Sequence, residues 1–417
     1  MGMALRQTLR ALVLLFIATP HLHAAPTGYA LPGLEAFDAE MTALMEKWNI
    51  PGASLAVAKD GRLLLAHGYG VANKETGELV QPTHLFRLAS LAKTITAVAI
   101  LQLVETGKLN LDDKVLPILG EIGPRPEVIS DPRVRDITIR HLLQHSAGFD
   151  RATVGDPVSM PRIAEAAGRQ GGPFPPNCQT VLRDSLERQL QFAPGDRYAY
   201  SNVGYCILGQ VVERVTGISF ERYAREKILA PSGANRMQIS RTVDTGEGEV
   251  TYHDHAEAPL VLAVPGYNRT MTARPYGMLP LEALSSVGGW SGTPVDYLRF
   301  LLAIDGQRGN PLLNTSTFAV LTDNRIPVRA GNANSAFYGL GVFIRPISNS
   351  IIWWHDGSQP GAFSFFVRRP EGYSWVVAFN SRPEKSSEFY ADLNRVLWNA
   401  KGQVKSWPNG DLFSRFP

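Results

Sequence analysis

The chain of 417 residues has few cysteines, no strong excess of charge and none of several common catalytic signatures. Its two cysteines, Cys178 and Cys206, lie far from any recognisable catalytic motif, so cysteine catalysis is not expected. No H-E-x-x-H, Walker loop or G-x-S-x-G occurs, which argues against zincins, nucleotide-binding enzymes and α/β-hydrolases. The net charge is +3, without a basic stripe or an RNA- or DNA-reading motif, so no nucleic-acid partner is expected.

Long apolar runs are also missing beyond the N-terminus. There, Arg6 and Arg10 precede the apolar run Ala11–Ala18, and small residues follow. This pattern predicts a secretory signal peptide over residues 1–24, cut after Ala24, and therefore an exported protein, periplasmic or secreted. The alternative is an uncleaved anchor, but the run is short for a stable membrane span. Cleavage would remove two arginines and no acid, which lowers the net charge from +3 to +1.

The first motif that can carry chemistry is Ser90-Leu91-Ala92-Lys93. Residues three apart on a helix share a face, so a lysine there can serve as the base that a serine nucleophile needs. Ser90 is placed as the N-cap of a buried helix over Thr94–Glu105, whose dipole and free N–H groups favour an oxyanion. The alternative is an ordinary capping serine with a surface lysine.

Two further motifs follow. Tyr200-Ser201-Asn202 precedes a predicted core helix over Val203–Val215, and its tyrosine can act as general base and acid. His355-Asp356-Gly357-Ser358 lies between two predicted strands, where Gly357 lets a ligand approach the backbone. The alternatives are a tyrosine that packs a turn and a structural histidine at a strand end.

These three motifs, in this order, resemble those of the β-lactamase-like, penicillin-recognising serine hydrolases. That family includes class C β-lactamases, D,D-carboxypeptidases, D-amino-acid-specific peptidases and amidases, and family VIII carboxylesterases. The resemblance extends over nearly the whole mature chain, because other segments also match family patterns. They are His141-Leu142-Leu143-Gln144-His145-Ser146-Ala147-Gly148, Gly288-Gly289-Trp290-Ser291 with Asp296-Tyr297-Leu298-Arg299-Phe300, and Tyr338-Gly339-Leu340-Gly341.

The resemblance implies a role for each motif residue. Ser90 would be the acylated nucleophile, Lys93 its base, and Tyr200 the group that passes a proton to the leaving group and later activates water. Asn202 would bind Lys93 and the flank of the substrate amide or ester. The backbone N–H groups of Ser90 and Ser358 would form the oxyanion hole, and no cofactor would be needed.

The third motif departs from the K-T-G of β-lactamases. His355 replaces the lysine beside Tyr200, and Asp356 replaces the hydroxyl residue. If Asp356 faces the site, it should repel a substrate carboxylate; if strand alternation turns it away, it is a surface charge. The preferred function is therefore a carboxylesterase-type hydrolase of small esters or amides. A D,D-carboxypeptidase or D-aminopeptidase acting on short D-peptides is the alternative, followed by a β-lactamase and a non-catalytic penicillin-binding scaffold.

The expected fold is α+β: an antiparallel sheet from both ends of the chain with an inserted, mainly helical lobe. The sheet part is placed at about residues 29–80 and 301–402, and the lobe at about 81–300, within one catalytic domain over 25–417. Helices are expected over 34–48 and 384–400, and strands over 53–58, 62–66 and 373–379.

Three secondary features complete the prediction. A disulfide between Cys178 and Cys206 is permissible after export, with two separate thiols as the alternative. The long segment 244–284, with Tyr267 and Tyr276, is expected to roof the pocket, and Trp290 to form a wall. His253-Asp254-His255 lacks a third metal ligand at recognisable spacing, so no metal is expected there.

Overall fold

The computed structural model describes residues 25–159, 162–171, 175–255, 257–263, 270–329 and 336–417. The predicted signal peptide over residues 1–24 and the pocket residue Tyr267 lie outside this part of the chain. Within it, no helix combines the length and the apolar character that crossing a bilayer requires.

Both ends of the chain contribute to one large antiparallel sheet. Within the described residues it has ten strands, in the order β1-β3-β2-β15-β14-β13-β12-β11-β10 with β4 beside β3. The central pair joins the two ends, because Ala53 of β2 pairs with Phe379 of β15. The strands are β1 Thr27–Ala30, β2 Gly52–Lys59, β3 Arg62–Asn73, β4 Glu78–Leu79, β10 Ile326–Pro327, β11 Phe337–Tyr338, β12 Phe343–Ile347, β13 Ser350–Gln359, β14 Ala362–Arg368 and β15 Tyr373–Phe379.

Helices cover both faces of the sheet, so its central strands are buried on both sides. Phe363 and Phe365 of β14 point to the face covered by α1 (Glu35–Trp48) and α13 (Ser386–Gln403). Their neighbour Phe366 points to the other face, which belongs to the core of the helical lobe. This alternation decides which residues of the neighbouring strand β13 can reach a site on either side.

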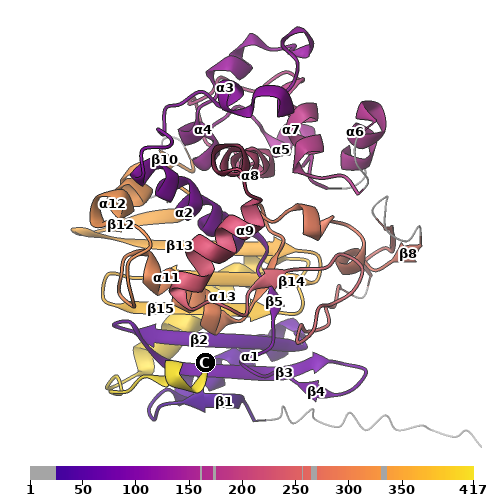
Figure 1. Ribbon diagram of the computed structural model, residues 1–417. Helices are drawn as coiled ribbons and strands as arrows, with labels where there is room; N and C mark the ends of the chain where they lie inside the picture. Colours follow the sequence, from indigo (N-terminus) through magenta and orange to yellow (C-terminus); the bar gives the residue numbers. More distant parts are fainter. Residues whose placement is uncertain (1–24, 160–161, 172–174, 256, 264–269, 330–335) are drawn as a thin grey trace, which may run out of the picture.

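In the sequence, the helical lobe lies between the two segments that form the sheet. In space, it forms the end of the molecule opposite strands β1–β4 (Figure 1). At its centre α2 (Ala92–Glu105) packs on α8 (Asn202–Thr216), and nearly every side chain of α2 is buried, as its apolar sequence predicts. The remaining helices are α3 Val115–Leu119, α4 Ile139–Leu143, α5 Arg151–Val154, α6 Arg162–Gln170, α7 Cys178–Leu186, α9 Phe220–Ala224, α10 Ala230–Ser232, α11 Pro294–Ile304 and α12 Thr315–Asp323. Short strands are β5 Phe86–Arg87, β6 Gln238–Ile239, β7 Val261–Leu262, β8 Met271–Thr272 and β9 Trp290–Gly292.

The two cysteines form a disulfide within this lobe. Cys178 is the first residue of α7 and Cys206 lies in α8, 28 positions later. The bridge ties α7 to the helix that begins at Asn202. The α+β arrangement expected from the sequence is thus confirmed.

Candidate active site

Ser90 lies on a tight turn between β5 and α2. The turn is the 3-10 helix η1, Ala89–Leu91, and α2 begins at Ala92 with Leu91 as its N-cap. The prediction that Ser90 caps the helix was therefore wrong, because an extra 3-10 turn precedes it. Ala89 has φ = 46°, in the left-handed region that costs an alanine energy, and such strain is typical of functional turns.

Lys93 is fully buried one turn after Ser90. Its Nζ lies 3.1 Å from Ser90 Oγ and donates to the carbonyl oxygen of Val287 at 2.9 Å. Burial lowers the pKa of Lys93 to about 7; the nearby Asp156 opposes this shift and Arg151 adds to it. A neutral amine that can accept the serine proton is therefore accessible near neutral pH.

Tyr200 reaches the same oxygen from the other side of the cleft. Its hydroxyl donates to Ser90 Oγ at 2.8 Å. Burial raises the pKa of Tyr200, so the phenol is protonated at neutral pH and donates. At the start of the reaction, the Tyr200 hydroxyl is therefore better suited to donate a proton than to act as the general base that the sequence also suggested.

The ring of Tyr200 is held between two groups. The ring centroid of His145 lies 4.2 Å from it, and the guanidinium carbon of Arg151 lies 4.4 Å from its centroid. His145 also binds the backbone on either side of Tyr200. Its carbonyl oxygen accepts from the N–H of Ala199 at 2.8 Å, and its Nδ1 from the N–H of Ser201 at 3.1 Å. His145 therefore fixes the position of the tyrosine, although the sequence analysis gave it no role.

Asn202 makes no hydrogen bond with Lys93, which corrects the prediction. Its Nδ2 donates to Asp156 Oδ2 at 2.6 Å, and its buried Oδ1 has no partner among the described residues. The charge-assisted bond to the carboxylate of Asp156 fixes the orientation of the amide, and Lys93 donates instead to the carbonyl oxygen of Val287. Asn202 nevertheless lines the cavity of Ser90, where its free oxygen can accept from a substrate N–H.

His355 is a neutral, buried histidine and not a substitute for a lysine. Its Nδ1 lies 2.6 Å from the carbonyl oxygen of Asp356 and its Nε2 lies 3.0 Å from the hydroxyl of Tyr338. Nδ1 therefore carries the proton, and Nε2 accepts from the tyrosine. Burial, with the charge of Lys93, lowers the pKa of His355 to about 3. Its ring centroid is 6.3 Å from that of Tyr200.

Asp356 lies on the far face of the sheet. It pairs with Phe365, whose side chain packs against Tyr390 of α13, whereas His355 pairs with Phe366 of the lobe core. Of the two orientations considered for Asp356, the structure has the one that turns it away. Asp356 therefore does not face a substrate carboxylate directly, although its charge acts through the strand on the pKa of Lys93 and of Tyr200.

Gly357 brings strand β13 against the nucleophile turn. A Cβ at Gly357 would overlap the carbonyl oxygen of Leu88 and Oγ of Ser364, so only glycine fits. Ser364 Oγ also donates to the oxygen of Leu88 at 2.7 Å. Beyond Trp354, β13 keeps its pairing with β14 but has no register with β12. One edge of β13 near Ser358 is thus open toward η1, where backbone N–H groups can bind an oxyanion.

The cavity in front of Ser90 has a volume of about 160 Å³. Ser358 and Asn202 line it together with an apolar wall made of Leu279, Leu281, Leu284 and Val287. All three leucines belong to segment 244–284, which the sequence analysis predicted as a roof. A cavity of this size accommodates a small acyl group.

Three charged side chains at this cavity were not predicted: Arg151, Asp156 and Arg382. Arg151 Nη1 lies 3.6 Å from Asp156 Oδ2. Arg382 makes no hydrogen bond or ion pair with another described residue, and its Nε is buried without a partner. Burial lowers the pKa of Arg382, and Arg274 adds to this effect. These side chains carry no recognisable motif, so only the fold brings them to the site.

The remaining predicted residues lie elsewhere. Trp290 is fully buried in the lobe core and donates to the carbonyl oxygen of Ser285, so it is not a wall of the cavity. Tyr276 is also away from the cavity; its hydroxyl accepts from the N–H of Tyr252 at 2.7 Å. Asp254 forms an ion pair with Arg274 at 2.6 Å, and no cluster of metal-ligating side chains occurs in the described ranges.

Comparisons with known proteins identify the family and the fold. The family model described as Beta-lactamase matches residues 37–397. Protein flp of Staphylococcus aureus is 24% identical over 358 residues, which cover 86% of this chain and 65% of flp. The chain thus spans less than two thirds of that relative's length.

Solved structures share the fold. The octameric penicillin-binding protein homologue from Pyrococcus abyssi has a TM-score of 0.64 and 25% identity, with 88% of this chain and 78% of that chain covered. D-amino acid amidase from Ochrobactrum anthropi SV3, in complex with L-phenylalanine amide, has a TM-score of 0.70 and 23% identity, with 90% and 99% covered.

Proposed function

Because the chain belongs to the Beta-lactamase family, we propose that it is an exported serine hydrolase that forms an acyl-enzyme on Ser90 and cleaves small esters or amides. The observation that carries the proposal is the convergence of Lys93 Nζ and Tyr200 OH on Ser90 Oγ. A nucleophile, a base with a pKa near neutrality and a proton donor lie within hydrogen-bond distance of one another. The proposal of export rests on the N-terminal sequence alone.

In the acylation step, protons pass from Ser90 to the leaving group through Lys93 and Tyr200. Ser90 Oγ attacks the substrate carbonyl carbon while its proton passes to neutral Lys93. The N–H groups of Ser90 and Ser358 bind the oxyanion. Tyr200 gives its proton to the departing alkoxide or amine, and Lys93 reprotonates Tyr200. Water then attacks the acyl ester, and its proton returns to Ser90 through the same pair.

Two substrate classes follow from the walls of the cavity. The leucine wall and the small volume favour a short, neutral acyl group, which agrees with a carboxylesterase-type activity. The unpaired Arg382 favours a substrate that carries a carboxylate, as the substrate of a D,D-carboxypeptidase does. The second class gains support because Asp356 does not face the site.

The nucleophile is tested by intact-mass spectrometry after incubation with a fluorescent penicillin, followed by turnover of 4-nitrophenyl butyrate. We expect an adduct or ester turnover in the wild type and neither in Ser90→Ala. Turnover that persists in Ser90→Ala would contradict the proposal. Absence of both in the wild type would favour a non-catalytic scaffold.

The substrate class is tested with a matched pair of esters, 4-nitrophenyl butyrate and mono-4-nitrophenyl glutarate, which differ by one carboxylate. If Arg382 binds anions, Arg382→Gln should lower kcat/KM for the glutarate about tenfold relative to the butyrate. Arg395→Gln, on an exposed part of α13, is the matched control. An unchanged ratio in Arg382→Gln would leave the neutral esterase as the proposal.

A further inference from the structure

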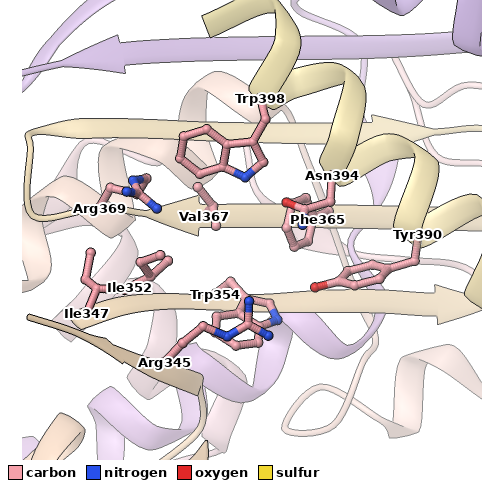
Figure 2. A pocket seen from close by; sticks show the side chains of 10 residues that line it. All are labelled: Arg345, Ile347, Ile352, Trp354, Phe365, Val367, Arg369, Tyr390, Asn394 and Trp398. Carbon is pink, nitrogen blue, oxygen red and sulfur yellow. The ribbon is translucent and has the colours of Figure 1, made fainter. Parts of the chain in front are cut away.

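A second cavity lies on the far face of the sheet from Ser90. It has a volume of about 320 Å³ and lies between strands β12–β14 and helix α13 (Figure 2). We call it the rear groove; its lining residues are Arg345, Ile347, Ile352, Trp354, Phe365, Val367, Arg369, Tyr390, Asn394 and Trp398. Its volume falls at the lower end of the range of small-molecule sites.

The rear groove is built from regular positions of the fold. Tyr390, Asn394 and Trp398 are spaced four apart and share one stripe of α13, as Figure 2 shows. Below them, Phe365 and Val367 alternate along β14 and form an apolar floor. Phe365 and Val367 are themselves almost fully buried, and the accessible apolar surface of the groove belongs to the half-buried Trp354, Tyr390 and Trp398.

One cation of the rear groove has no carboxylate partner. Arg345 is exposed and makes no hydrogen bond or ion pair with another described residue; its guanidinium carbon lies 5.6 Å from the ring centroid of Trp354. The second arginine, Arg369, is already paired with Glu371 at 2.7 Å. An anionic group would therefore bind at the Arg345 end.

The other end of the rear groove differs in charge. Burial raises the pKa of Tyr390, the charge of Asp356 adds to the rise, and Arg345 opposes it. Tyr390 packs against Phe365, which pairs with Asp356 of the neighbouring strand. Arg345 is thus the charged group in the groove that lacks a carboxylate partner among the described residues, and a ligand with one anionic and one apolar end would place its anionic end beside it.

We propose that the rear groove is a binding site for a small organic carboxylate with an aryl or alkyl body. The body would lie against the half-buried rings of Tyr390 and Trp398, and the carboxylate would pair with Arg345 beside Trp354. This proposal does not depend on acyl-enzyme formation at Ser90, and a catalytically inactive chain would still bind the ligand.

The test is isothermal titration calorimetry of the full chain with 4-phenylbutyrate and its neutral analogue 4-phenylbutyramide. We expect one equivalent of the acid to bind, the amide to bind at least about tenfold more weakly, and Arg345→Gln to weaken the acid about tenfold. Asn394→Trp, which fills the groove, should abolish binding. Thermal melts check that each variant is folded.

Two controls separate the rear groove from other cationic sites. Arg395→Gln, on the same helix but outside the groove, should bind like the wild type. Loss of binding in Arg382→Gln but not in Arg345→Gln would place the anion in the cavity of Ser90 and overturn the proposal. No saturable binding by the wild type, or equal binding of acid and amide, would overturn it as well.

Discussion

Lys93 has the pKa that makes activation of Ser90 sensitive to pH in the physiological range. Protonated Lys93 cannot accept the serine proton, so activity should be low below pH 7, rise through about pH 7 and level off above it. The pH dependence of kcat/KM for 4-nitrophenyl butyrate measures this. The observed midpoint belongs to the coupled set of Lys93 and Tyr200.

Lys93→Ala supplies the control for that profile. Without its base, Ser90 should lose about a thousandfold or more in kcat/KM, and the rise near pH 7 should vanish. A wild-type profile that stays flat between pH 5.5 and 8.5 would mean that Lys93 is not the group that titrates.

Asp356→Thr should leave substrate preference unchanged, because this carboxylate faces α13 and not the cavity of Ser90. We expect the ratio of kcat/KM for mono-4-nitrophenyl glutarate and 4-nitrophenyl butyrate to stay within about twofold of the wild type. A large rise for the glutarate would show that Asp356 acts on the substrate after all.

Some site residues could be predicted from sequence and others could not. Ser90 and Lys93 were found because helical spacing brings them together within one turn. Asp156 and Arg382 are isolated in sequence, and only tertiary packing carries them to Ser90. Asn202 was placed in the right cavity but on the wrong partner, since the competing carboxylate comes from a loop that shows no pattern.

At the scale of elements, the contact between β13 and η1 requires a residue without a side chain at Gly357. Gly357→Ala would place a methyl group against Leu88 and Ser364 and push the nucleophile turn away from the strand. We expect kcat/KM to fall about a hundredfold or more, the effect of losing an oxyanion donor.

Gly402→Ala is the matched control for that substitution. Gly402 lies in α13 with nothing within 4 Å of an added Cβ, so the change should preserve activity and stabilise the helix by up to about 1 kcal/mol. Comparison of kcat/KM and thermal melts for the two variants separates the effect of the contact from that of replacing a glycine. Equal kcat/KM in Gly357→Ala and Gly402→Ala would mean that the nucleophile turn can move away from β13 without loss of activity.

The disulfide between α7 and α8 should contribute stability without taking part in catalysis. Replacing Cys178 and Cys206 together by serine should lower the free energy of unfolding by about 2–4 kcal/mol, because the bridge restricts the unfolded chain. Denaturant unfolding measures this, and ester turnover at 25 °C should be retained. If the folded double variant instead lost ester turnover, the bridge would be needed to position Asn202.

Element types were more predictable than their packing. The strand expected over 53–58 and the helices beginning at Glu35 and Ser386 follow from local patterns and appear close to their expected bounds. The strand expected over 62–66 begins as predicted but extends to Asn73. Trp290 was misplaced because an aromatic residue beside a glycine pair is compatible with either a pocket wall or a core. The burial that decides between them comes from residues distant in sequence.

For the whole molecule, one face of the sheet carries the candidate active site, and the other face packs against α1 and α13 and contributes mainly to stability. Phe389 of α13 is fully buried and contacts Trp48, Phe363 and Phe379 on the face away from Ser90. Phe389→Ala should lower the free energy of unfolding by about 3–5 kcal/mol and leave kcat of the folded enzyme unchanged. Denaturant unfolding and active-site titration, with Arg395→Ala as surface control, measure both quantities.

The central pairing of β2 with β15 has a consequence for biosynthesis. The edge of β2 that meets β15 has no partner until the C-terminal strands have been made. At about 5–20 residues per second, this interval lasts on the order of tens of seconds, during which an unpaired strand edge can recruit other chains. Synonymous codons that slow translation before β15 should therefore increase aggregation of nascent chains without altering the finished enzyme. Expression in a host that lacks holdase chaperones should have the same effect.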